Sequence, residues 1–224
     1  LGLIQGNAYL EGPLIKDKLS FHFSMRRSWA DLITAPTFAI MNKREFWGKG
    51  DGYNARYSFH DINGRMDWIQ SERSRWSLSV YSGDDFFKIH GWDGSSSSDE
   101  YEQEDKYKIR WGNFATALNW NYRVNPKFQS LFTASYTRYR SKLFYSQQEH
   151  YYNVDYIESQ TVSGIDDGRL SWQFSYRPNR RNRIQGGISA RIQGFRPEYM
   201  EEGTFAGDEM TEESVQVKTQ NALR

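Results

Sequence analysis

The sequence predicts an all-β protein built as a meander of antiparallel strands. Apolar and polar side chains alternate with period two in six segments, and short connections alternate strictly with long ones along the 224 residues. Aromatic residues make up 17% of the chain, which is too many for a disordered polypeptide. These three observations together indicate strands with one apolar and one polar face.

The six alternating segments define the predicted strands. Successive side chains of a strand point to opposite faces, so every second residue shares a face. The apolar faces of the six segments consist, in chain order, of Leu19, Phe21, Phe23 and Met25; Trp76, Leu78 and Val80; Phe114, Leu118, Trp120 and Tyr122; Phe128, Phe132, Ala134 and Tyr136; Leu170, Trp172, Phe174 and Tyr176; and Ile184, Ile188, Ala190 and Ile192. Serine, asparagine, glutamine and arginine dominate the positions between them.

The connections differ in length in a regular order. Tight polar turns are expected near 12–18, 71–75, 124–127 and 178–183, and long links near 31–55, 92–106, 146–165 and 196–214. We therefore expect about eight strands arranged as four hairpins, with no helix. The long links are interpreted as loops.

Loop asymmetry bears on which solvent the apolar faces meet. Transmembrane β-barrels have short turns on one side of the membrane and long loops on the other, with aromatic residues at the interfaces. Here aromatic residues flank the tight turns, namely Trp68, Trp76, Trp120, Tyr122, Phe128 and Tyr176. We interpret the chain as part of an antiparallel transmembrane β-barrel whose apolar faces contact lipid.

Several other functions receive no support from the sequence. A net charge of +1 does not favour a nucleic-acid partner, and the absence of cysteine excludes disulfides and thiolate metal sites. The four histidines are dispersed, and no run of about 18 apolar residues predicts a spanning helix. We expect neither an enzyme, nor a metal site, nor a cofactor.

A family resemblance is carried by several motifs in order. The segment "GNAYLEGPLIKDKLSFHFSMRRSWADLI" resembles the early barrel of TonB-dependent outer-membrane receptors of the Bacteroidetes type, with their Glu-Gly-Pro and Lys-Asp-Lys turn and Arg pair. "FHDINGRMDW", "RWSLSVYSGDDFF" and "SGIDDGRLSWQFSYRPN" with "GFRPEY" are similar to later hairpins of the same barrels. Correspondences extend across nearly the whole chain.

The resemblance implies a 22-stranded barrel in the outer membrane of a Gram-negative cell. It implies TonB-dependent nutrient uptake of a large solute (an oligosaccharide, a peptide or a metal chelate), with the TonB complex acting through a plug domain and with a surface lipoprotein as a further partner. Residues 1–224 would form one partial barrel domain of about eight strands, without the plug. The final "SVQVKTQNALR" is interpreted as the start of another strand.

Candidate binding residues fall in the long links and on the polar faces. Aromatic side chains with interspersed amides suit sugar rings or peptide side chains. The expected ligand-binding residues of the extracellular loops are Trp47, Tyr53, Tyr151, Tyr152 and Tyr156. His22, Arg26 and Arg191 are expected to face the lumen of the barrel.

Two alternatives remain open at this point. A self-contained eight-stranded outer-membrane barrel would serve as a structural anchor or adhesin, although small residues such as Ser24, Ser79 and Ser171 would fill its interior poorly. A soluble β-sandwich that binds carbohydrate would instead bury the apolar faces under a second layer of protein.

Overall fold

The structure is a computed structural model. It describes the backbone of residues 2, 4–47, 50–94, 102–151, 153–206, 209–215 and 220–223. Side chains are described within these ranges as far as Arg196, apart from those of residues 102, 150, 151 and 153–156.

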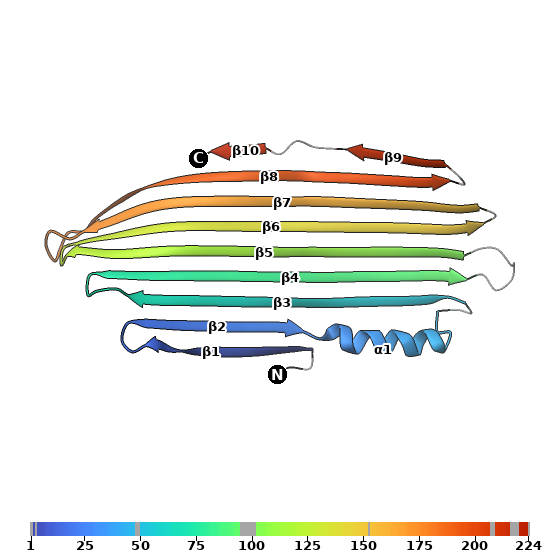
Figure 1. Ribbon diagram of the computed structural model, residues 1–224, viewed down its shortest axis with the longest axis horizontal. Coiled ribbons are helices and arrows are strands. Elements are labelled where there is room, and N and C mark those ends of the chain that lie inside the picture. The colour runs from blue at the N-terminus through green and yellow to red at the C-terminus, as the bar shows by residue number, and fades with distance from the viewer. Residues whose placement is uncertain are drawn as a thin grey trace.

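The described residues form one antiparallel sheet (Figure 1). Eight strands follow one another in chain order, and two short strands, β9 and β10, lie end to end and both pair with β8. The elements are β1 (Gln5–Ile15), β2 (Leu19–Ser28), α1 (Ala30–Lys43), β3 (Gly52–Ile69), β4 (Ser74–Gly94), β5 (Glu102–Asn125), β6 (Phe128–Tyr151), β7 (Asn153–Tyr176), β8 (Ile184–Ala206), β9 (Glu209–Val215) and β10 (Gln220–Leu223). The predicted all-β antiparallel meander is confirmed. Within the final segment 214–224, which is expected from the sequence to begin another strand, residues 214 and 215 end β9 and residues 220–223 form β10.

Asparagine side chains accept hydrogen bonds within two of the tight turns. Asn125 Oδ1 accepts from the backbone N–H groups of Lys127 and Phe128, both at 2.9 Å. Asn179 Oδ1 accepts in the same way from Arg181 at 3.0 Å and Asn182 at 2.9 Å. Asn favours such turns because its side chain can replace a backbone acceptor. All four predicted tight turns lie where the sequence indicates them, at one end of the sheet, which we call the turn end.

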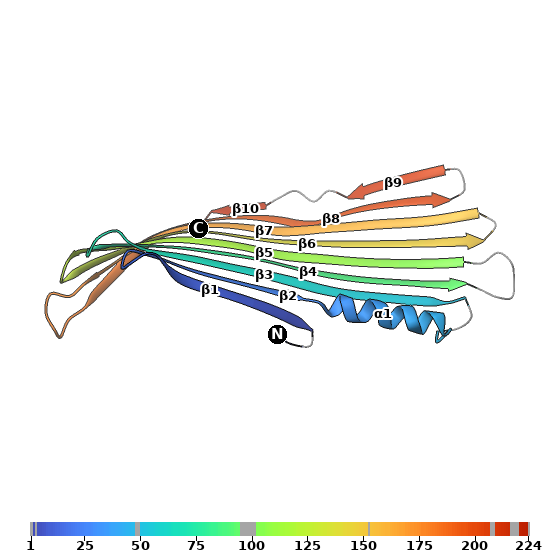
Figure 2. The ribbon, with the colours of Figure 1, turned by 60° about the horizontal axis from the view of Figure 1, so that its bottom comes forward.

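The sheet is a single curved layer (Figure 2). Among the described side chains, no hydrophobic residue is buried, and Trp172 and Ile188 are 48% and 71% exposed. The apolar faces of neighbouring strands are in register: Met66 pairs with Leu78, Leu78 with Leu118, and Leu118 with Ala134. The apolar side chains therefore form one continuous surface that no second protein layer covers in the described part of the chain.

Two expectations about the long links are wrong. Residues 146–165, expected to be a loop, belong almost entirely to β6 and β7, and much of 92–106 and 196–214 extends β4, β5, β8 and β9. β5, β6 and β7 each have 24 residues, so the hairpins continue well past the alternating segments. Tyr53 likewise lies in β3, and Tyr151 and Tyr156 lie in β6 and β7, rather than in loops.

The third correction is α1, which occupies the first long link. The helix runs beside the far half of β3, beyond the point where β2 ends (Figure 1). Asn42 links the two elements: its Nδ2 donates to Tyr53 O at 2.9 Å, and its Oδ1 accepts from Tyr53 N at 3.0 Å. No helix in the described residues is long and apolar enough to cross a membrane.

Candidate functional site

The two faces of the sheet differ in chemistry near the turn end. One face, which we call the band face, carries the apolar side chains, including Phe21, Met66, Leu78, Leu118 and Leu170. The opposite face, which we call the serine face, carries small and polar residues, namely Ser24, Asn63, Ser79, Ala117, Ser135, Arg169, Ser171 and Ser189. Every strand from β2 to β8 contributes to both faces.

The chemistry of the two faces is exchanged farther along the strands. On β5 the band face passes from Leu118 to Arg110 and Lys108, while the serine face passes from Ala117 to Trp111 and Ile109. The same exchange occurs on β3, β4 and β6, and the register keeps it aligned across the sheet. The far end therefore carries an aromatic serine face formed by Tyr53, Tyr57, Phe59, Phe87, Tyr107, Ile109, Trp111, Tyr139 and Tyr145.

The three polar residues expected to face a lumen all lie on the serine face. His22 pairs with Arg65 and Arg26 with Asp61 between β2 and β3, and Arg191 pairs with Arg169 between β7 and β8. The guanidinium of Arg191 forms an ion pair with Asp167. All three side chains are therefore on the side of the sheet opposite the apolar surface.

Arg26 takes part in a small polar network midway along the sheet. Its Nε donates to Asp61 Oδ2 at 2.8 Å, and the Tyr81 hydroxyl donates to Asp61 Oδ1 at 2.9 Å. A methyl group on Gly83 would lie 2.4 Å from the Tyr81 oxygen, so glycine leaves room for this hydroxyl. The Asp61 side chain is only 16% exposed, because Arg26 and Tyr81 cover it.

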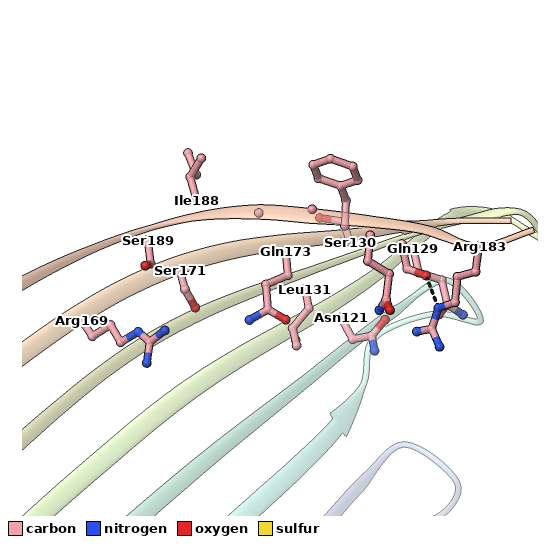
Figure 3. Close-up of a pocket in the computed structure, with 15 residues that line it drawn as sticks. Asn121, Gln129, Ser130, Leu131, Arg169, Ser171, Gln173, Arg183, Ile188 and Ser189 are labelled. Carbon is pink, nitrogen blue, oxygen red and sulfur yellow. Dashed lines mark hydrogen bonds between the residues drawn. The ribbon is translucent and has the colours of Figure 1, made fainter.

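A hollow of about 580 Å³ lies near the turn end over β6, β7 and β8 (Figure 3). Arg169, Gln173 and Asn121 lie on one side of the ribbon, and Ile188 points away from them. Amide, hydroxyl and guanidinium groups dominate the lining on the serine face. Such an open, hydrated surface lacks the apolar enclosure that is typical of small-molecule sites.

A second hollow, which we call the far-end pocket, has the composition of a ligand site. It occupies about 310 Å³ between the end of α1 and strands β3, β4 and β5. Trp47, Tyr53 and Trp92 supply aromatic surface, and the Trp47 and Tyr53 rings lie 5.6 Å apart. The polar lining groups are Asp51, Asp93, Gln103 and Asp105. Aromatic rings beside carboxylates and an amide can bind a polar ligand that has a flat apolar face.

The carboxylates of the far-end pocket interact with one another. A hydrogen bond with Asp51 raises the pKa of Asp93, and the negative charge of Asp51 adds to the effect. Asp51 Oδ1 also accepts from the backbone N–H of Gly94 at 3.3 Å. A ligand that donates hydrogen bonds to both carboxylates would offset the repulsion between their charges.

The structure brings together two of the five predicted binding residues, Trp47 and Tyr53. Tyr152 lies outside the described residues, as do the side chains of Tyr151 and Tyr156. The same pocket is also lined by Trp92, Asp51, Gln103 and Asp105, which were not predicted from the sequence. Trp92 lies 39 positions from Tyr53 in the sequence, and only the pairing of β3 with β4, with Gly52 opposite Trp92, brings it to the pocket.

Comparison with known proteins does not assign this chain to a family. No protein-family model matches the chain, and no curated protein matches its sequence significantly. Within the described ranges, no group of three or more histidine or acidic side chains is placed to hold a metal ion.

Proposed function

We propose that this chain is a segment of a TonB-dependent outer-membrane receptor that takes up a large solute. The observation that supports it best is the continuous apolar surface of the band face. A strand crosses a bilayer in about 9–11 tilted residues. The run from Phe128 to Tyr136 on β6 meets this length, and charged Arg138 follows it on the same face.

The proposed membrane-crossing segments are the apolar runs of β2 to β8. The runs at 114–122, 128–136, 168–176 and 184–192 have nine residues each, and those at 19–25, 62–68 and 76–82 form the apolar parts of spans that continue along their strands. Aromatic residues lie side by side at their turn end: Trp68 pairs with Trp76, Trp76 with Trp120, and Phe132 with Trp172. Such a row is typical of the interface between hydrocarbon and headgroups.

The open edges of the sheet favour a segment of a larger barrel over a self-contained small one. In the described residues β1 pairs with β2 alone, and the strands at the other edge pair with β8. An eight-stranded barrel would require these edges to meet, because unpaired backbone groups in hydrocarbon cost several kcal/mol each. Small serine-face residues such as Ser79 and Ser135 fit a wide lumen that holds a separate plug domain.

In this proposal the far-end pocket lies on the extracellular side and contacts the solute. The substrate would be an oligosaccharide, a peptide or a metal chelate, and the aromatic serine face would continue the path inward from Trp47 and Tyr53. A plug domain elsewhere in the complete protein, pulled by the TonB complex, would open the passage, and a surface lipoprotein would cover it.

Cysteine labelling of neighbouring residues tests the membrane placement. This chain has no native cysteine, so Leu170→Cys and Arg169→Cys can be compared in the complete protein in cells, with any cysteine outside this chain replaced by serine. These adjacent positions lie on opposite faces. We expect a lipophilic maleimide to label Leu170→Cys while a membrane-impermeant one does not, and the impermeant reagent to label Arg169→Cys, whose side chain is exposed on the serine face. A protein that stays soluble without detergent would refute the proposal.

TonB dependence is tested separately in cells that lack TonB. Uptake of a candidate oligosaccharide, peptide or chelate should stop in these cells, while the amount of the receptor in the outer membrane stays unchanged. Uptake that continues at the same rate would contradict the transport part of the proposal.

A further inference from the structure

Basic side chains gather on the band face beyond the apolar surface. We call Arg56, Lys88, Lys108, Arg110 and Lys142 the basic patch. Arg56 pairs with Lys88 and Lys88 with Lys108, so one row of the sheet places three positive charges next to one another. In the adjacent row Arg110 pairs with Lys142. Four neighbouring strands, β3 to β6, contribute to the patch.

The sheet leaves most of this charge uncompensated. Arg110 has an ion pair with Asp84 at 3.3 Å, and the ammonium of Lys108 lies 4.5 Å from the centroid of the Phe144 ring. Arg56, Lys88 and Lys142 have no carboxylate in salt-bridge range among the side chains that the structure describes. Like charges directly opposite each other in a sheet are destabilising.

Lys88 shows the electrostatic consequence. Its pKa is lowered, first because partial burial desolvates the ammonium and then because Lys108 and Arg56 repel its charge. A bound anion would attract all three positive charges and so offset the repulsion that Lys108 and Arg56 exert on Lys88. The patch is therefore suited to binding negative charge.

The position of the patch indicates which anion it would meet. On β4, Lys88 follows the apolar Leu78 and Val80 on the same face, and on β6, Lys142 follows Ala134 and Tyr136. Between apolar surface and patch lies a zone of paired charges, in which Arg140 contacts Asp166 at 3.0 Å. A lipid monolayer has the same order, from hydrocarbon through the interface to phosphate groups.

We propose that the basic patch binds the phosphate groups of anionic lipids in the leaflet that surrounds the far end of the sheet. This assignment rests on the proposed function, in which the band face contacts lipid. Arginine can bind phosphate oxygens with two parallel hydrogen bonds, and lysine supplies a flexible point charge. At the same level the serine face is aromatic rather than basic, so the positive charge lies only on the side that would face lipid.

Native mass spectrometry of the complete protein in non-ionic detergent tests this assignment. The probes are dioleoylphosphatidic acid, dioleoylphosphatidylcholine and inorganic phosphate. We compare the wild type with a triple variant, Arg56→Gln, Lys88→Gln and Lys108→Gln. Since each basic residue near an anionic surface contributes about 1 kcal/mol, the triple variant should bind phosphatidic acid roughly 100-fold more weakly.

The matched control removes three exposed arginines from the serine face, by Arg75→Gln, Arg123→Gln and Arg169→Gln. It has the same loss of charge, and we expect wild-type lipid binding. Equal binding by the wild type and the basic-patch variant would overturn the inference. So would equal binding of phosphatidylcholine, or displacement of the lipid by inorganic phosphate at equal concentration, which would indicate a site for free anions.

Outer-membrane fractionation separates failure of this inference from failure of the proposed function. If the wild type enters the outer membrane and the basic-patch variant keeps its lipid affinity, only the basic-patch inference falls. If the wild type is absent from the membrane, both fall.

Discussion

Asn42 continues the hydrogen-bond ladder of β3 with its side chain. Its amide donates to Tyr53 O at 2.9 Å and accepts from Tyr53 N at 3.0 Å, as a neighbouring strand would do. β2 ends at Ser28, so no β2 residue is available to pair with Tyr53. The helix α1 thereby covers an edge of the sheet that would otherwise present unpaired backbone groups.

Removing this side chain should loosen the far end of β3. We expect Asn42→Ala to leave both Tyr53 backbone groups unpaired and to reduce local stability by about 1–3 kcal/mol. Faster amide hydrogen exchange at Tyr53 in the complete protein would report the loss. Thr37→Ala is the control, because Thr37 donates to Ile33 O within the helix and has no hydrogen bond to Tyr53 in the part of the chain that the structure describes. Equal exchange at Tyr53 in both variants would contradict the role of Asn42.

Two glycines of β3 that share the band face should respond differently to a methyl group. A Cβ on Gly52 would lie 1.8 Å from the Trp92 ring, whereas a Cβ on Gly64 would meet nothing within 4 Å. Gly52→Ala should displace Trp92, distort the far-end pocket and cost about 1–3 kcal/mol. Gly64→Ala should be neutral or stabilise the protein by about 0.4–1 kcal/mol.

Thermal unfolding of both variants in detergent checks the difference in stability. Hydrogen exchange over residues 91–93 checks whether the far-end pocket changes. If Gly52→Ala leaves both measurements unchanged, the Trp92 ring does not pack over Gly52.

The exchange of chemistry between the two faces explains which features could be predicted from the sequence. Near the turn end Leu118, Trp120 and Tyr122 occupy every second position and share one face, so alternation identifies the strand and its apolar face. Farther along β5 the large apolar residues, Trp111 and Ile109, lie on the opposite face. The alternation that identifies a strand assumes that the apolar residues stay on one face, so it ends at this exchange. For this reason the sequence predicts loops where the far halves of the strands lie.

The far-end pocket was predictable only in part, for a related reason. Trp47 and Tyr53 stand out as aromatic residues close together in the sequence, and the structure brings them together. Asp51 carries no distinctive local motif, and the approach of Gln103 and Asp105 depends on the β4–β5 register. The sequence does not predict α1, because the segment has no strong apolar stripe, as its lack of buried residues shows, and because Pro36 is typical of a loop.

The hydroxyl of Tyr81 should stabilise the network around Asp61. Tyr81→Phe removes one hydrogen bond at 2.9 Å and should cost about 1 kcal/mol. Asp61→Ala should cost more, because it also leaves Arg26 without its carboxylate. Tyr122→Phe is the control, since Tyr122 contacts Trp120 through its ring. The thermal unfolding temperature should fall least in Tyr122→Phe, more in Tyr81→Phe and most in Asp61→Ala. A different order would contradict this network.

Acid should weaken the far end of the β4–β5 pair through Glu104. A hydrogen bond from Lys106 lowers the pKa of Glu104 below its ordinary value of 4.5, and a hydrogen bond with His90 acts in the same direction. Because the folded pKa is the lower one, this stabilisation is fully present above pH 4.5 and is lost as the pH falls through the folded value. Amide exchange at residues 104–106, corrected for the intrinsic rate, should therefore accelerate only below pH 4.5. Glu104→Gln should abolish this acid dependence, and Lys106→Met should shift it to higher pH because it removes the larger of the two favourable hydrogen bonds. An acid transition that persists unchanged in Glu104→Gln would assign it to another group.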